Sequence, residues 1–311
     1  MHRKATPQKN VRRTIPLQYN PQNVNQGEHA MHKPHVLKTK IGTTSLQYLL
    51  YGGDGPTLIM LHATGFNPWL WHPIARELSS RFRIIAPFFC DHRDTDPYRG
   101  GLGWNILAGD LVGLCRNLNI DKPYLVGHSM GGGVCVLAHG LSPGLAEKMI
   151  LIEPILLPES RYDKPLPLEE HPLARQAIRR KNRWPTPAEA ERYLQSKPLF
   201  RNWDREMLDL YLQYGMTVDT DGSLQLACSP RGEAAIFMGG AAENPWPLLP
   251  GISCPVLILE GENSESRKML DLKKAAGLFP QGEHRLVPGA GHLIPMEIPR
   301  VIIDLIGECF G

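Results

Sequence analysis

The sequence predicts an α/β protein with a mostly parallel central sheet and helices on both faces. Short apolar runs of strand length alternate with segments in which apolar residues recur at helical spacing. Strands that are buried on both faces of a parallel sheet have continuous apolar sequences of this kind. The composition, with 42% hydrophobic and 21% charged residues, is that of a globular protein, and 311 residues suit one large α/β unit with an insertion.

The expected elements follow in a regular order from residue 46. Strands are expected at 46–52, 57–62, 83–89, 123–129, 149–154, 255–261 and 284–289. Helices are expected at 69–80, at 105–118, directly after residue 129 and at 301–310. In the second of these, Leu107, Leu111, Leu114 and Leu118 recur at helical spacing and form one apolar face. This alternation is typical of a parallel sheet, in which a helix connects successive strands.

The stretch from 157 to 250 interrupts the alternation. It is rich in proline at both ends, and its pattern indicates helices at 171–184, 185–195 and 203–215. A hairpin that turns at Asp221-Gly222 is expected after them. We therefore expect a core made of residues 41–156 and 251–311, with 157–250 inserted as a mainly helical cap.

Residues 1–40 differ from the rest in composition. They hold eight Lys and Arg residues against one acidic residue, Glu28, and are rich in Gln, Asn and Pro. This composition predicts a disordered basic N-terminal extension. An organelle transit peptide and a natural translation start at Met31 are both compatible with it. Because the surplus positive charge lies here, the rest of the chain is mildly acidic, and we expect no nucleic-acid partner.

The cysteines show no CxxC motif and no metal-ligand spacing. We expect buried free thiols and a cytoplasmic location, because most of the cysteines lie in apolar runs. The six residues are Cys90, Cys115, Cys135, Cys228, Cys254 and Cys309. No apolar run approaches the roughly 20 residues of a membrane span, so none is expected. The oligomeric state is left open.

The segment Gly127-His128-Ser129-Met130-Gly131 joins an expected strand to an expected helix. Small residues two positions on either side of Ser129 allow the tight turn that presents a serine hydroxyl. The start of the following helix offers free backbone N–H groups to a developing oxyanion. Ser129 is therefore the candidate nucleophile, and it needs a general base because a serine hydroxyl is a poor nucleophile at neutral pH.

A glycine-bracketed loop near the C-terminus, Gly289-Ala290-Gly291-His292, supplies that base. With these two motifs, residues 41–311 resemble the α/β-hydrolase family. In that family the nucleophile, acid and histidine follow in this chain order, and the cap is inserted after the strand that follows the nucleophile helix. The resemblance implies the α/β-hydrolase fold, a cap at 157–250 and His292 as the base. His128 is interpreted as a packing residue.

The resemblance also implies an oxyanion hole. Leu61-His62-Ala63-Thr64-Gly65-Phe66 resembles the family's HG-containing loop, with Ala63 in place of the usual glycine. Position matching assigns the backbone N–H groups of Thr64 and Met130 as donors, with Phe66 as an alternative. A backbone donor tolerates a change of side chain, so the departure does not threaten activity.

Three glutamates compete for the role of the acid. Family members most often place it three or four residues after the strand expected at 255–261, which gives Ser264 and Glu265 here, with Glu262 nearby. The family's other position follows the strand after the nucleophile helix, where Glu153 stands. A carboxylate that ends an apolar strand needs a partner, and His292 can be that partner. We expect Glu153 to complete the triad and keep Glu265, Glu262 and a structural role for Glu153 as alternatives.

Three further features are weaker indications of function, and each has a structural interpretation as well. Phe66, Trp69 and Trp71 beside the expected hole, and Phe200, Trp203 and Tyr211 in the cap, suit an apolar substrate part or an ordinary core. The loop 90–96 is interpreted as a solvated turn without a cation site. The cluster of Arg179, Arg180, Lys181 and Arg183 fits an exposed helix face or a patch that attracts carboxylate-bearing substrates.

Together these residues predict a serine hydrolase that acts through an acyl-enzyme on a small or medium ester, lactone or thioester. No cofactor and no metal are expected, and the partner is a small-molecule ester-like substrate. C–C bond hydrolysis and cofactor-free perhydrolysis use the same triad and stay open, as does a non-catalytic ligand-binding member of the fold. Dehalogenase and epoxide-hydrolase activities are disfavoured, because those family members carry aspartate where Ser129 stands.

Overall fold

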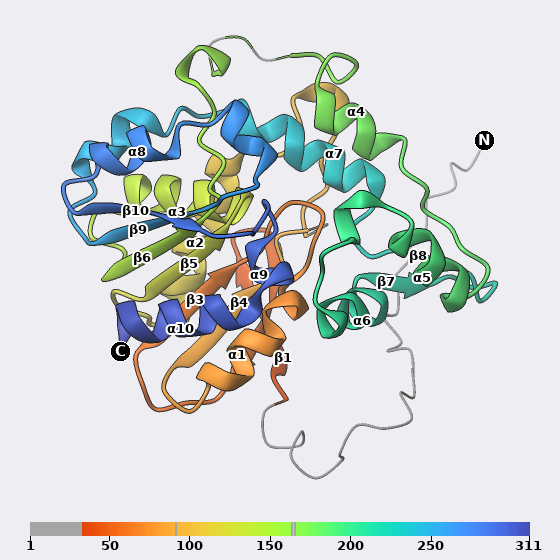
Figure 1. The fold of residues 1–311 in the computed structure, drawn as a ribbon, viewed down its shortest axis with the longest axis horizontal. Coiled ribbons are helices and arrows are strands. Elements are labelled where there is room, and N and C mark those ends of the chain that lie inside the picture. The colour runs from red at the N-terminus through yellow and green to blue at the C-terminus, as the bar shows by residue number, and fades with distance from the viewer. Residues whose placement is uncertain (1–32, 91, 163, 165) are drawn as a thin grey trace, which may run out of the picture.

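The computed structural model describes residues 33–311 except residues 91, 163 and 165. In this part of the chain eight strands form one sheet in the order β1-β2-β4-β3-β5-β6-β9-β10 (Figure 1). They are β1 (His35–Ile41), β2 (Thr44–Tyr51), β3 (Thr57–Leu61), β4 (Arg83–Pro87), β5 (Tyr124–His128), β6 (Lys148–Ile152), β9 (Val256–Gly261) and β10 (Gly282–Val287). β2 pairs antiparallel with β1 and β4, and all other neighbours are parallel. The expected α/β fold is confirmed.

β1 lies within the segment whose composition predicts a disordered extension. That prediction is wrong for residues 35–40, which pair with β2. Most side chains of β1 are exposed, so no apolar run marks the strand, and its backbone pairing holds it at the sheet edge. Residues 1–32, which include Met31, lie outside the described residues.

Helices cover both faces of the sheet. Successive side chains of a strand point to opposite sides, so each buried strand presents apolar side chains to the helices on both faces. Leu58 and Met60 of β3 belong to one apolar cluster with α1 and α10, whereas Ile59 and Leu61 belong to another with α2, α3 and α8. Figure 1 shows α1 and α10 together on the near face of the sheet. The helices are α1 (His72–Leu78), α2 (Trp104–Asn117), α3 (Met130–Leu141), α8 (Leu272–Leu278), α9 (Ile294–Glu297) and α10 (Pro299–Phe310).

Between β6 and β9 the chain leaves the sheet, and residues 157–250 are called the insert below. The insert contains α4 (Pro172–Ile178), α5 (Pro187–Gln195), α6 (Arg205–Tyr214), α7 (Pro230–Met238) and a hairpin of β7 (Met216–Val218) and β8 (Leu224–Leu226). The hairpin turns at Gly222, whose φ of 83° lies in the left-handed region that glycine tolerates. α7 is an additional helix that the sequence pattern did not predict.

The insert is attached to the core by contacts of several kinds. Its apolar side chains continue the cluster that covers one face of the sheet. The backbone N–H of Asp204 donates to the carbonyl of Met296 (2.8 Å), and the Trp104 indole donates to the carbonyl of Ile236 (2.9 Å). No helix among the described residues is long and apolar enough to cross a membrane.

A disulfide joins the two parts as well. Cys90, just after β4, is bonded to Cys228, just before α7 in the insert. The prediction of six free thiols is therefore wrong for these two residues, and it is confirmed for the other four cysteines, three of which are buried. A cytoplasmic location was inferred from free thiols, and the disulfide removes that support, because such bonds persist mainly in oxidising compartments.

Candidate active site

Ser129 occupies the turn between β5 and α3. Its backbone has φ 57° and ψ −112°, a conformation that a residue with a side chain rarely adopts. The turn is held by hydrogen bonds, because the N–H of Ser129 donates to the carbonyl of Ile152 (2.9 Å) and its carbonyl accepts from Gly132 (3.1 Å). The expected strand-turn-helix arrangement around Ser129 is thus present.

The glycines of the motif are needed because backbone segments approach each other closely here. A Cβ atom on Gly127 would lie 2.4 Å from the carbonyl oxygen of Gly131, and one on Gly131 would lie 2.4 Å from the carbonyl oxygen of Leu61. Neither distance is compatible with a side chain. The second contact also brings the loop after β3 against the first turn of α3.

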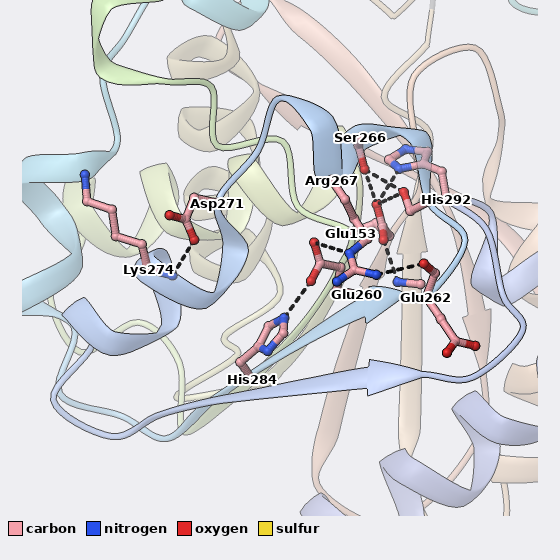
Figure 2. A network of polar contacts seen from close by, with 11 residues as sticks. Glu153, Glu260, Glu262, Ser266, Arg267, Asp271, Lys274, His284 and His292 are labelled. Atoms are coloured by element: carbon pink, nitrogen blue, oxygen red, sulfur yellow. Dashed lines mark hydrogen bonds and ion pairs between the residues drawn. The ribbon is translucent and has the colours of Figure 1, made fainter.

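His292 connects Ser129 to Glu153. Its Nε2 lies 3.0 Å from Ser129 Oγ. Its Nδ1 lies 2.8 Å from Oε2 of Glu153, and Figure 2 shows these two side chains facing each other. Because a carboxylate only accepts hydrogen bonds, Nδ1 carries the proton and Nε2 accepts from the serine hydroxyl. The three side chains expected to act together therefore form one hydrogen-bonded line. The side chain of His292 is 30% exposed, so it can be reached from solvent.

His128 supports the loop that carries His292, in keeping with its interpretation as a packing residue. Its Nε2–H donates to the carbonyl oxygen of His292 (2.9 Å). Burial, followed by the nearby His292, lowers the pKa of His128 to about 3. His128 is therefore neutral at physiological pH and acts as a hydrogen-bond donor, not as a second charged group.

Glu153 follows directly after β6 and is fully buried. Its backbone is left-handed, with φ 48°, and its N–H donates to the carbonyl of Leu259 (2.7 Å). Oε1 accepts the N–H of Gly261 (2.6 Å). Burial raises the pKa of Glu153, but the hydrogen bond and charge of His292 and the donors Ser266 and Gly261 outweigh burial and hold the pKa below its ordinary value. The buried carboxylate is therefore ionised.

The other two candidate acids have different partners. Glu265 is exposed and pairs with Lys268. Glu262 is also exposed, and its carboxylate accepts the N–H of Gly289 (2.9 Å). Among the three candidates, Glu153 is the one that contacts His292.

Two serines beside Glu153 were missed as site residues. Oε2 of Glu153 accepts hydrogen bonds from Ser264 Oγ (2.8 Å) and Ser266 Oγ (2.5 Å). Ser264 stands three residues after Gly261, at a position where the family often places the acid, and a serine carries no charge with which to act as that acid. The spacing from Gly261 is the one sequence signal that places these serines near Glu153, and it does not show that their hydroxyls point inward.

The expected oxyanion donors lie on two adjacent elements. Met130 is the first residue of α3, and Thr64 lies in the loop after β3, the strand next to β5. His62 shapes this loop, because its Nδ1–H donates to the carbonyl of Ala63 (2.8 Å) and its Nε2 accepts the N–H of Phe89 (3.0 Å). Within the described residues, neither the Thr64 nor the Met130 N–H has a protein acceptor. Both are therefore available to a ligand.

The aromatic residues near the site pack mainly against one another. Phe66 makes edge contacts with Trp203 and Tyr211 of the insert, at centroid distances of 5.4 and 5.8 Å. Phe200 lies 4.8 Å from Trp203, and Trp69 stacks on Tyr214 at 3.8 Å. These contacts connect the insert to the loop after β3.

The loop 90–96 is not a solvated turn. His92 and Arg93 both bind the buried carboxylate of Asp110 in α2, at 2.9 and 2.5 Å. The disulfide at Cys90 and these contacts with Asp110 hold the loop against the core, which is why it is not a solvated turn. Asp91 lies outside the described residues. No group of side chains suited to a metal ion is found in the part of the chain that the structure describes.

The basic cluster of the insert does not form one exposed face. Arg180 turns inward, where it pairs with Glu233 (2.5 Å) and its side chain is 22% exposed. Arg183 pairs with Asp219 and Asp221 of the hairpin. Arg180 and Arg183 are therefore paired with carboxylates, whereas Arg179 and Lys181 are exposed.

Comparison with known proteins agrees with this fold. The alpha/beta hydrolase family matches residues 58–305. Over 257 residues the chain is 26% identical to 2-(acetamidomethylene)succinate hydrolase of Mesorhizobium japonicum, a match that covers 82% of this chain and 87% of that enzyme. A match of 32% identity to an uncharacterised Mycobacterium tuberculosis protein is shorter and covers 29% of its length.

Two solved structures have a similar fold. The crystal structure of E-2-(acetamidomethylene)succinate hydrolase has a TM-score of 0.74 at 24% identity and covers 88% of this chain and 98% of that one. An esterase from Thermogutta terrifontis has a TM-score of 0.64 at 25% identity and covers 89% of this chain and 97% of that one. Because the family match spans most of the sequence, the chain belongs to the alpha/beta hydrolase family.

Proposed function

We propose that the chain is a serine hydrolase that cleaves a small or medium ester, lactone or thioester. The observation that carries the proposal is the hydrogen-bonded line from Ser129 through His292 to the buried Glu153. The relatives at 26% and 25% identity are a hydrolase and an esterase by name, which fits this reaction class. Residues 157–250 are proposed to act as a cap over the site.

The first half of the reaction forms an acyl-enzyme. Ser129 Oγ attacks the substrate carbonyl carbon while its proton passes to Nε2 of His292. The negative charge that develops on the carbonyl oxygen is bound by the N–H groups of Thr64 and Met130. Collapse of the tetrahedral intermediate breaks the bond to the alcohol or thiol, which leaves with the proton held by His292.

The second half releases the acid. Water attacks the acyl carbon and gives a proton to Nε2 of His292, and Ser129 Oγ then departs and takes that proton back. Through both halves Glu153 holds Nδ1–H and stabilises the protonated imidazole. A strained backbone at Ser129 fits this role, because such conformations are kept at functional sites.

A fluorophosphonate probe and a panel of esters with different acyl lengths test the proposal. We expect the wild-type chain to be labelled once and to hydrolyse part of the panel, and Ser129→Ala to lose both properties. Ser223→Ala is the matched control, because it removes a buried serine hydroxyl in the insert hairpin and is expected to change neither.

The same samples address the alternatives. Turnover of a diketone or of hydrogen peroxide with a carboxylic acid, but of no ester, would favour C–C hydrolysis or perhydrolysis. Tight ligand binding without labelling and without turnover would favour a non-catalytic member of the fold and would contradict the proposal.

A further inference from the structure

We propose that Ser264 and Ser266 are positioning residues that hold the Glu153 carboxylate in the one orientation that serves His292. This inference rests on the proposed function, since it concerns the same three side chains. It adds two residues that belong to no motif of the sequence and that come from the loop after β9.

The two oxygens of Glu153 have different surroundings. Oε1 accepts the backbone N–H of Gly261, whereas Oε2 is shared by His292 and the two serine hydroxyls. Rotating the carboxylate would break all of these contacts at once. A glutamate side chain has three rotatable bonds and loses much conformational freedom when it is fixed, so a buried glutamate needs such contacts to keep one orientation.

The two serines have only two hydroxyl protons to donate. Ser264 Oγ and Ser266 Oγ lie 2.6 Å apart, and each is also within hydrogen-bond distance of Oε2. Two hydroxyl protons thus serve three short contacts. Either both hydroxyls donate to Oε2, or one donates to the other, which donates to Oε2. In both cases Oε2 accepts at least one hydroxyl proton, so one serine can partly replace the other.

The turn that carries Ser266 is itself fixed. Ser266 lies in η8 (Glu265–Lys268), and the neighbouring Arg267 donates to the carbonyl of Glu262 (2.8 Å). Arg267 also approaches Glu260 of β9 (3.6 Å), whose carboxylate binds His284 of β10 (2.8 Å). Figure 2 shows Arg267, the residue after Ser266 in the chain, with its contacts to Glu260 and Glu262, and His284 bound to Glu260. These contacts of Arg267 attach the turn that carries Ser266 to the end of β9.

The first experiment removes the hydroxyls singly and together. We expect Ser264→Ala and Ser266→Ala each to lower kcat about three- to fivefold and the double variant about a hundredfold, with KM unchanged. The double loss exceeds the product of the single losses, because each serine compensates for the other. Ser266→Thr keeps a hydroxyl and is expected to restore most of the activity. Ser223→Ala is the matched control, since Ser223 is a buried serine that donates to a carboxylate elsewhere (2.6 Å).

The second experiment uses the position of Ser264. Its Oγ and His292 Nδ1 each lie 2.8 Å from the same oxygen, so they are close enough for a carboxylate at 264 to reach the imidazole. We expect Glu153→Gln/Ser264→Asp to recover at least about tenfold in kcat over Glu153→Gln alone. A double alanine variant with kcat within twofold of wild type, or a kcat loss matched by Ser223→Ala, would overturn the proposal.

A readout without substrate separates this inference from the proposed function. The Nδ1 proton of His292 should give a low-field NMR resonance in 15N-histidine-labelled protein, and it should move or broaden in the double alanine variant but not in Ser223→Ala. If the resonance changes in the double alanine variant while the folded wild type hydrolyses no ester, the proposed function is contradicted and the positioning role is supported. An unchanged resonance in the double variant would contradict the positioning role alone.

Discussion

Glu153 combines features that are unfavourable when taken singly. It is charged, fully buried and held in a left-handed backbone conformation. A strained non-glycine residue costs about 1–3 kcal/mol, and an unpaired buried charge costs more. Its hydrogen bonds to Gly261, Ser264, Ser266 and His292 compensate for the burial of the charge. Strain and burial of this kind are expected where a side chain must be fixed for function.

Exchanging Glu153 for glutamine tests its role as the acid. Glu153→Gln keeps the size of the side chain but offers His292 an amide instead of a carboxylate, so neither the required tautomer nor the imidazolium is stabilised. We expect kcat for an ester substrate to fall about 10²- to 10⁴-fold. Glu265→Gln and Glu262→Gln are matched controls and should stay within twofold of wild type. A large loss in Glu265→Gln would show that the acid is assigned to the wrong residue.

Two buried histidines affect how stability depends on pH. Burial lowers the pKa of His62 to about 4, and burial with the nearby His292 lowers that of His128 to about 3. Protonating His62 would remove the acceptor that the N–H of Phe89 uses. Protonating His128 would place a proton on Nδ1, which has no partner among the described residues.

Both histidines therefore destabilise the fold on acidification. Below the unfolded-state pKa of about 6.5 the unfolded chain binds protons that the folded chain does not, so stability is lost as pH falls from about 6.5 toward the folded values. Each histidine contributes up to about 1.4 kcal/mol per pH unit. Urea unfolding between about pH 7 and pH 5 should show this slope, and His128→Gln should reduce it by about one proton. The exposed His35→Gln is the control. An unchanged slope in His128→Gln would contradict the assignment.

At the scale of elements, the turn from β5 to α3 brings three backbone segments into contact. Gly127 faces the carbonyl of Gly131, and Gly131 faces that of Leu61 at the end of β3. Because the contacting atoms are backbone, they cannot yield as a flexible side chain would. The glycines thus determine where Ser129 and the Thr64 loop lie relative to each other.

Two glycine-to-alanine exchanges, which are expected to change the free energy of unfolding in opposite directions, test the role of this close backbone approach. Gly131→Ala places a Cβ atom 2.4 Å from a carbonyl oxygen and should destabilise the fold by about 1–3 kcal/mol and lower kcat. Gly109, inside α2, has nothing within 4 Å of the same position, so Gly109→Ala should stabilise by about 0.5–1 kcal/mol. Denaturant unfolding measures both. Equal effects of the two exchanges would show that helix propensity, not close approach, explains the motif.

The sequence was informative about most of the central sheet, although α7 and α8, which also bury apolar residues, were not predicted. The seven strands with apolar runs were expected, and so was the turn at Ser129, because its glycines report close backbone approach. β1 was not, because its exposed side chains leave no apolar run and its pairing is made by the backbone. Ser264 and Ser266 were missed for a similar reason, since a hydroxyl that points at a buried carboxylate has no periodicity.

For the whole molecule, the site forms where several parallel strands end at one edge of the sheet. Thr64 follows β3, Ser129 follows β5, Glu153 follows β6, Ser264 follows β9 and His292 follows β10. Ligand sites of α/β sheets lie at this edge because loops from distant parts of the chain meet there. The order of the strands, and not proximity in sequence, brings the candidate residues together.

The same reasoning explains why the disulfide was not predicted. Cys90 and Cys228 are separated by 138 positions and lie in different parts of the fold, so their pairing depends on how the insert packs on the core. Nothing in the spacing of the six cysteines indicates it. A second contact lies in the same region, where Arg231 of the insert pairs with Asp96 (2.9 Å) at the end of the loop 90–96.

The Cys90–Cys228 bond should stabilise the attachment of the insert to the core. Closing a long loop restricts the unfolded chain, so reduction should lower the free energy of unfolding by about 2–4 kcal/mol. Cys228→Ser should have the same effect, and reductant should then change nothing further, which is the internal control. Thiol titration of the denatured chain should find the four free cysteines before reduction and all six after it. Six reactive thiols in the unreduced protein, or a melting temperature that reductant lowers equally in Cys228→Ser, would contradict the bond or its stabilising role.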